Sequence, residues 1–494
     1  MPKKMPIFYS ALLLTGVNLL LRLVSTSFQV YISGKIGAAG VGLLQLVMSV
    51  GAMAMTLGVA GIRTTAMYLS AEEIGKKRPE GIRWILSGCF TYSIVCSGAV
   101  ALLLYFSAPF LAEHWIGDVR TVDAIRLYAG FLPVSCMCGV MTGYFTAANR
   151  IATLAAVEVA EQLLSMVVTM SVLTLWAGHD PARACQSIIL GSGISLCMTL
   201  ICLILLRIKE KPKVGPPIPV RHRLLHTAVP LALADDLKAG ISTTENLMVP
   251  KRLALFAGVI DPLAAFGIVC GMVFPIIMFP AAILYALAEL LIPELARCAA
   301  AGSRERIRYL SKRSLRVALL YGCLFCGLEY LLSDQLATTL YKTPEAAKYI
   351  RLYALLIPML YCDAITDAMI KGLGQQKASV RYNIITSTMD VAFLFVLLPR
   401  YGMEGYFLSF FITHLINFFL SIRRLLKIVG PVVSAKVPIL TLLCTWGSIW
   451  AVSAVSSNTL RCCAYILIFG CLLTLLGVVG KADLFWLKGL VAKK

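Results

Sequence analysis

Charged residues are scarce in this sequence. They make up 14% of its 494 residues, whereas hydrophobic residues make up 59%. A soluble protein carries roughly 25% charged residues to cover its surface. The mean hydropathy of +0.83 points the same way, and the charges gather between long apolar runs. This scarcity excludes the set of about three soluble domains that the length alone would suggest. It predicts a polytopic membrane protein instead.

Motifs for metal binding and for catalysis are also missing. The sequence has 16 cysteines and 5 histidines, but no Cys/His pair outside the apolar runs has the spacing of a metal site. The closest approaches are Cys136-x-Cys138 and Cys323-x-x-Cys326, and both lie in hydrophobic stretches where cysteine packs as a small apolar residue. We therefore expect no metal site and no cofactor.

Long apolar stretches are abundant in the sequence. A helix needs about 20 predominantly apolar residues to span a bilayer. Stretches of this kind lie at 7–32, 39–70, 84–108, 122–147, 152–176, 185–206, 224–249, 262–293, 315–333, 349–373, 380–398, 403–422, 437–455 and 462–479. The predicted fold class is an all-α integral membrane protein with about 14 transmembrane helices.

Basic residues predict the orientation of these helices. The formal net charge is +20, and cytoplasmic loops of membrane proteins are enriched in Lys and Arg. With the N-terminus inside, about two thirds of the 45 Lys and Arg fall in cytoplasmic segments and about a fifth in the opposite loops. Both termini are therefore predicted to be cytoplasmic. The same bias accounts for the positive charge, so we expect no nucleic-acid partner.

A short pattern occurs twice. Residues 142–154 close the fourth predicted span and open the fifth, and residues 367–380 do the same for the tenth and eleventh, with Asn149 aligned on Gln375. The offset is an even number of spans, so both copies keep one orientation, as in transporters built from parallel repeats. We predict two parallel, pseudo-symmetric six-helix lobes plus two C-terminal helices. The predicted domains are an N-terminal lobe at 1–207, a cytoplasmic linker at 208–223, a C-terminal lobe at 224–428, and two helices with a cytoplasmic tail at 429–494.

Basic residues inside the predicted spans are candidate functional residues. An ionised group at the bilayer centre costs ~2.5–3.5 kcal/mol even on insertion scales, so it faces a cavity, a partner or a transport path. Arg22 lies among leucines well inside the first span, with no acid nearby in sequence. It is either cavity-facing or part of a permanent structural pair. Arg63 lies in the second half of the second span, where it faces the cavity or snorkels to the interface.

Acidic residues lie in several other predicted spans, and Asp390 is in the eleventh. Glu158 and Glu161 share one face of the fifth span, and the seventh carries Asp236 and Lys238, which could simply neutralise each other. The candidates for substrate binding are Arg22, Arg63, Lys238 and Glu245. The candidates for coupling to an ion, which must be reachable from a cavity, are Glu161, Asp235, Asp236 and Asp390.

Several segments in order carry a resemblance to a known family. They are residues 245–253 (Glu-Asn-Leu-Met-Val-Pro-Lys-Arg-Leu), 290–296 (Leu-Leu-Ile-Pro-Glu-Leu-Ala), 371–374 (Lys-Gly-Leu-Gly) and 402–406 (Gly-Met-Glu-Gly-Tyr). Through them the whole chain resembles the stage V sporulation protein B branch of the MOP (multidrug/oligosaccharidyl-lipid/polysaccharide) exporter superfamily.

The resemblance implies a function. Members of this branch flip undecaprenyl-pyrophosphate-linked sugars, including the peptidoglycan precursor lipid II, across the bacterial cytoplasmic membrane. In the lipid II flippases a cationic central cavity meets the pyrophosphate, and Arg22 stands where their first span carries an arginine. Phe28 stands where some relatives have a second arginine, a departure that bears on the identity of the substrate.

Three classes of function remain in competition. A flippase for a lipid-linked oligosaccharide suits the two arginines, because its headgroup is anionic. A multidrug/cation antiporter of the same fold would favour an acid in the first span, which has none, and an acidic cavity. A membrane enzyme would need a catalytic constellation, usually on a sizeable outer loop, and the outer loops are short. We expect a non-enzymatic, monomeric flippase whose partners are the lipid-linked anionic substrate, membrane lipids and a coupling ion, either sodium or the proton.

Overall fold

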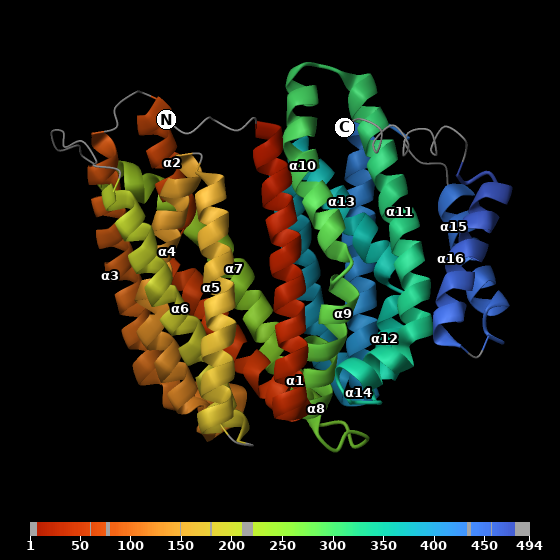
Figure 1. The fold of residues 1–494 in the computed structure, drawn as a ribbon, viewed down its shortest axis with the longest axis horizontal. Helices are drawn as coiled ribbons and strands as arrows, with labels where there is room; N and C mark the ends of the chain where they lie inside the picture. The colour runs from red at the N-terminus through yellow and green to blue at the C-terminus, as the bar shows by residue number, and fades with distance from the viewer. Residues whose placement is uncertain are drawn as a thin grey trace. The chain divides into compact units, whose positions relative to one another are not determined.

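The structure, a computed structural model, describes residues 7–59, 61–75, 80–148, 150–177, 180–209, 221–431, 436–455 and 457–479. Every regular element in these ranges is helical (Figure 1), which confirms the all-α prediction. Most of the predicted linker at 208–223 lies outside the described residues, as do the first six residues and the predicted tail from residue 480.

Many of these helices are suited to a membrane. Eight helices in the described ranges are long and apolar enough to cross one, or ten if each of two bent pairs forms a single span. Large apolar side chains also stand exposed on them, as Leu102 (61%), Leu103 (68%) and Phe106 (76%) do on α3 (Gly81–Phe110). Lipid is the solvent that such a surface requires. The chain is thus a multi-pass membrane protein, and the number 14 stays a prediction.

Two helices are too long for a single crossing. α1 (Ile7–Val59) has 53 residues and α14 (Gln376–Val429) has 54. At about 1.5 Å per residue each would measure about 80 Å, against a hydrocarbon core of about 30 Å. Each contains one glycine outside helical geometry, Gly37 (φ 70°) and Gly402 (φ 57°). Both glycines fall in the gaps between predicted spans, so the sequence located these kinks.

The chain forms two compact units, which we describe separately. The first comprises residues 1–271 and 391–406. Its helices after α1 are α2 (Ile62–Gly75), α3, the π-helical turn η1 (Leu111–Ile116), η2 (Val119–Thr121), α4 (Val122–Ala147), α5 (Ile151–Val172), η3 (Leu173–Ala177), α6 (Pro181–Lys209), α7 (Arg221–Leu253) and α8 (Pro262–Gly267). The helix α4 packs against α2, α3 and α6, and α5 packs against α6.

The second unit comprises residues 272–390 and 407–494. The π-helical turn η4 (Ile268–Val273) runs into it. Its helices are α9 (Phe274–Met278), α10 (Ala281–Ala300), α11 (Arg304–Gln335), η5 (Leu336–Leu340), α12 (Ala346–Ala354), α13 (Ile357–Gly372), most of α14, α15 (Lys436–Ala451) and α16 (Asn458–Leu475). The helix α11 packs against α10, α12, α13, α15 and α16. The predicted lobe boundary at 208–223 stays a prediction.

The repeated pattern coincides with two similar helix breaks. In the first copy α4 ends at Ala147 and α5 begins at Ile151, and in the second α13 ends at Gly372 and α14 begins at Gln376. With Asn149 aligned on Gln375, the two breaks between helices fall within one residue of the same place.

Small residues set the spacing of helices within the first unit. A Cβ on Gly42 of α1 would lie 2.2 Å from the Leu263 carbonyl oxygen of α8, and one on Gly267 would lie 2.1 Å from the Ala38 carbonyl oxygen. Glycine at both positions lets the two backbones approach as closely as helices do in membranes, where small residues drive association.

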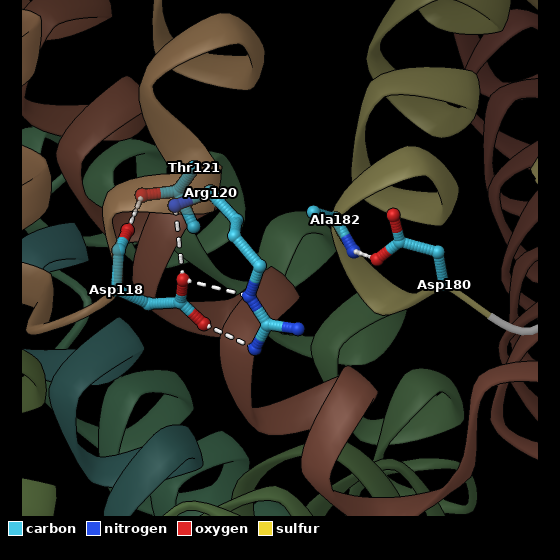
Figure 2. A network of polar contacts seen from close by, with 5 residues as sticks. All are labelled: Asp118, Arg120, Thr121, Asp180 and Ala182. Carbon is cyan, nitrogen blue, oxygen red and sulfur yellow. Dashed lines mark hydrogen bonds and ion pairs between the residues drawn. The ribbon is translucent and has the colours of Figure 1, made fainter.

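A network of polar contacts fixes the connection that leads into α4 (Figure 2). The Asp118 carboxylate accepts from the backbone N–H of Arg120 (3.0 Å) and from its guanidinium (3.0 and 2.7 Å), while the Asp118 carbonyl accepts from the Thr121 hydroxyl (2.7 Å). Asp180 accepts from the N–H of Ala182 (3.0 Å) and so caps α6. The hydrogen bonds from Arg120 hold the pKa of Asp118 below its usual range.

Candidate functional site

A cavity of about 510 Å³ lies inside the first unit. Helices α1, α2, α4, α5 and α6 all contribute to its wall. Apolar and polar side chains both contribute to the lining, and the polar groups converge on it from different helices, as they do in binding sites of small molecules. The polar and ionisable residues in the lining are Arg63, Ser135, Cys138, Thr142, Glu158, Glu161, Gln162 and Thr199.

Close packing of α2 on α4 places Arg63 in this cavity. The two glycines of α4 that follow the pattern Gly139-x-x-x-Gly143 face the start of α2. A Cβ on Gly143 would lie 2.4 Å from the Arg63 carbonyl oxygen, and one on Gly139 would lie 3.8 Å from the Arg63 Cβ. Since glycine alone leaves room for this approach, the Arg63 side chain emerges at the cavity wall while its backbone rests on α4.

Two carboxylates of α5 face the same cavity. Glu158 and Glu161 are three residues apart, so the helix presents them on one side, as the sequence predicted. The Arg63 guanidinium is close enough to Glu158 to attract it electrostatically. Glu161 is within hydrogen-bonding reach of the Thr199 hydroxyl on α6. Both carboxylates are half-buried.

The charges in the wall allow two kinds of ligand. One guanidinium can form paired hydrogen bonds with the oxygens of a phosphate or a carboxylate. Two carboxylates in a half-buried place can bind a proton or a metal cation. The arrangement can therefore hold an anion at Arg63 and a cation at Glu161 and Glu158, in the same volume.

Arg22 lies beside this cavity on α1. Its neighbour Leu21 is in the lining, whereas the Arg22 side chain itself is exposed. Arg22 was predicted to face a cavity, and its role stays a prediction. The kink at Gly37 lies about four helical turns further along α1, so Arg22 and Leu21 belong to the segment of α1 that precedes the kink.

The predicted site residues of α7 are spread over that helix. Lys238 is exposed, and Asp236 is half-buried within electrostatic range of Tyr92 on α3. Glu245 is half-buried and within electrostatic range of Cys270. The side chain of Asp235 lies outside the described residues. Of the three whose side chains are described, Asp236, Lys238 and Glu245, none lines the 510 Å³ cavity.

Asp390 belongs to the second unit. Its side chain is 5% exposed and accepts hydrogen bonds from Ser409 (2.5 Å) and Thr413 (3.3 Å), both on the later part of α14. The kink at Gly402 folds α14 back on itself and so brings residues about twenty positions apart into contact. The structure therefore brings Arg63 and Glu161 together and leaves Asp390 in a cluster of its own.

Several polar residues of the cavity were not among the predicted site residues. Gln162 follows Glu158 by four positions, so the same helical periodicity that paired Glu158 with Glu161 could have identified it. Thr142 and Thr199 come from other helices, and no spacing along the chain relates them to α5.

Comparisons with known proteins agree with this architecture. A family described as "Polysaccharide biosynthesis protein" matches residues 8–221, and the family MatE matches residues 259–396. Stage V sporulation protein B of Bacillus subtilis (strain 168) is 24% identical over 416 residues, which cover 80% of this chain and 78% of that protein. Sporulation protein YkvU of the same organism is 21% identical over 278 residues, covering 54% of this chain and 62% of the relative.

Solved structures show the same fold. The lipid II flippase MurJ in an inward closed conformation matches with a TM-score of 0.74 at 12% identity, over 94% of this chain and 98% of that one. A multidrug resistance MATE family transporter of the MOP superfamily, in an inward-facing conformation, matches with a TM-score of 0.66 at 14% identity, over 90% of this chain and 100% of that one.

Proposed function

Since the chain belongs to the MOP exporter superfamily, we propose that it is a transporter that flips an undecaprenyl-pyrophosphate-linked sugar across the bacterial cytoplasmic membrane by alternating access. The sugar would be a precursor of peptidoglycan or of another polysaccharide. The names of two relatives support this proposal, because one is a sporulation protein and the other a lipid II flippase.

The placement of Arg63 is the observation that carries the proposal. Its guanidinium lines a cavity of about 510 Å³, and Arg22 follows the cavity residue Leu21. A guanidinium keeps its charge in a low-dielectric cavity, and its planar set of donors matches pyrophosphate oxygens in pairs. Lys238 and Glu245 complete the proposed substrate-binding set, and either Asp235 or Glu245 would be an internal acid that competes with substrate for an arginine.

Coupling to an ion would run through the acids. Glu161 lines the cavity, and Asp390 is held by two hydroxyl groups in the second unit. Together with Asp235 and Asp236 they are the proposed groups for binding sodium or the proton. An electrical contribution is also available, since the membrane potential supplies ~2.3 kcal/mol per charge per 100 mV.

The transporter would act as a monomer, with both termini on the cytoplasmic side. We propose no enzymatic activity, because the observed cavity residues fit binding and release of an intact substrate.

A cation antiporter is the second candidate function. The cavity contains two carboxylates, Glu158 and Glu161, for one guanidinium. An excess of acid would favour a cationic substrate over an anionic one. The MatE match at residues 259–396 also supports this alternative.

One experiment separates the two functions. The purified full chain is reconstituted into vesicles, and the movement of a fluorescent lipid-pyrophosphate sugar between leaflets is measured beside the efflux of a cationic dye. We expect the lipid substrate to move and the dye to be retained. Dye efflux without lipid movement would reject the flippase in favour of the antiporter.

A further inference from the structure

Glu329 is a buried acid that the proposed transport site does not use. It lies on α11 in the buried stripe that also contains Cys326 and Ser333, and it is 5% exposed. The predicted span 315–333 includes it. An acid at such a position is costly to maintain, and acids inside membrane helices commonly mark ion or proton paths.

Neither carboxyl oxygen of Glu329 has a hydrogen-bond partner among the described residues. Asp390, by contrast, is equally buried but accepts from two hydroxyl groups. A buried carboxylate without a cation or a donor would bear the full cost of desolvation. Glu329 therefore holds a proton in this conformation.

The groups that face Glu329 are neutral. On α11 itself they are Tyr321 and Cys326, and α13 contributes Tyr361. Tyr285 of α10 lies near Tyr361, and Tyr465 of α16 lies near Cys326. One helical turn further along α11, Ser333 accepts a hydrogen bond from the cation Arg351 of α12 (2.8 Å), which also pairs with Asp334.

Two of these neighbours hold a helix break together. The Tyr361 hydroxyl donates to the Ile277 carbonyl oxygen (2.9 Å), and the Tyr321 hydroxyl donates to the Pro280 carbonyl oxygen (2.9 Å). Both carbonyls flank the break between α9 and α10, where Pro280 interrupts the helix. The hydroxyl groups of Tyr321 and Tyr361 therefore donate to the backbone at this break rather than to Glu329.

A polar route joins Glu329 to one end of α11. Ser333 lies about 6 Å further along the helix axis, and Asp334 and Arg351 follow at the exposed end. This end is opposite the basic first turns of α11 (Arg304, Arg306 and Arg308), which the charge distribution predicts to be cytoplasmic. The route thus leads toward the outer side.

We propose that Glu329 is a proton-binding site that is loaded and emptied from the outer side and that its ionisation releases the break between α9 and α10. The carboxyl O–H bond breaks, the proton passes to water at the Ser333–Arg351 end, and the electron pair stays on the carboxylate. The new charge then attracts the hydroxyl groups of Tyr321 and Tyr361 away from Pro280 and Ile277. The site does not depend on which substrate the protein moves.

The test compares Glu329→Gln with the matched control Glu345→Gln. Glu345 is an exposed acid in the same unit, just before α12. Infrared spectra of the full chain in lipid nanodiscs are recorded while the pH is raised. The wild type and E345Q should have a protonated-carboxyl band that is lost at high pH, and E329Q should lack that band from the start. Identical bands in all three proteins would overturn the proposal.

The link to the helix break has its own measurement. Hydrogen exchange of residues 277–283 is compared between the wild type and E329Q at each pH. We expect protection in the wild type to fall as the band disappears and protection in E329Q to persist. Equal protection at every pH would overturn the link. If E329Q does not fold, Glu329→Leu replaces it, since an apolar side chain of similar size needs no partner in this site.

Discussion

Arg223, at the start of α7, donates from Nη2 to the Glu72 carboxylate of α2 across 2.7 Å. Its Nη1 donates to Glu73 across 3.1 Å, and the Glu73 side chain is only 3% exposed. These contacts attach the first turn of α7 to α2, the helix that carries Arg63. Glu73 is buried, and Arg223 is its ion-pair partner.

Removing this partner should destabilise the first unit. Arg223→Ala leaves a buried carboxylate uncompensated, which costs on the order of 3 kcal/mol. We expect a lower thermal unfolding midpoint in detergent, and partial recovery in the double variant Arg223→Ala/Glu73→Gln. Arg83→Ala, which changes an exposed arginine of α3, is the control. An equal midpoint for both single variants would contradict the assignment.

Arg22→Ala should express and insert but lose transport. Loss of a hydrogen-bonded charge from a substrate site is worth about 1.5–3 kcal/mol, so we expect flipping to fall by about tenfold or more. Arg22→Lys should recover only part of the rate, because an ammonium lacks the planar set of donors. Membrane abundance is measured beside flipping. A permanent structural pair would instead reduce abundance, and an unchanged flipping rate in Arg22→Ala would remove Arg22 from the site.

Gly143→Ala should impair transport through the position of Arg63. The new Cβ would lie 2.4 Å from the Arg63 carbonyl oxygen, so α2 must shift, at a cost of about 1–3 kcal/mol. Gly98→Ala on α3 is the matched control, because a Cβ there meets nothing within 4 Å and alanine favours a helix by about 1 kcal/mol. We expect Gly143→Ala to be less stable and slower in flipping. If Gly98→Ala were instead the less stable and slower of the two variants, the close contact between Gly143 and Arg63 would not be needed for transport.

Glu161→Gln should change the ion dependence of transport more than Glu305→Gln, because Glu161 lines the cavity and Glu305 is exposed on α11. The rate is measured with and without sodium and with and without a proton gradient. If Glu161→Gln keeps the full rate and the same ion dependence, this acid has no part in coupling.

Stability should depend on pH through Asp118. Its pKa is lowered in the folded protein by the hydrogen bonds from Arg120, so its contribution is present above the ordinary Asp value of about 3.9 and is lost as the pH falls below it. Arg120 is 63% exposed, so solvent screening limits the effect to under about 1 kcal/mol. Unfolding midpoints of the wild type and Asp118→Asn should converge on acidification. A constant difference between them would contradict this assignment.

Local patterns predicted a large part of the fold. Apolar length identified a helical membrane protein, and Gly37 and Gly402 fall in the predicted gaps because a chain that must cross a bilayer of fixed thickness has to turn at intervals. The pair Glu158 and Glu161 was also predictable, since helical periodicity alone puts both side chains on one face.

Contacts between distant helices were not predictable in this way. The sequence identified Arg63 and Glu161 as separate candidates. The cavity that contains both depends on the close packing of α2 against Gly143 of α4, and α6 contributes Thr199 to the same lining. Glu329 was not predicted as a site residue, because the apolar run around it does not reveal which other helices pack on α11, and its burial to 5% exposure is a property of the folded protein.

The sequence by itself determined the helical class and the candidate charges, because both follow from how individual residues partition between water and lipid. Only the tertiary structure decided which charges meet in a cavity, which are satisfied by neighbours as Asp390 is, and which, like Glu329, have no hydrogen-bond partner in the described part of the chain. The reason is physical: a charge's environment in a membrane protein is set by the helices packed around it, and those come from anywhere along the chain.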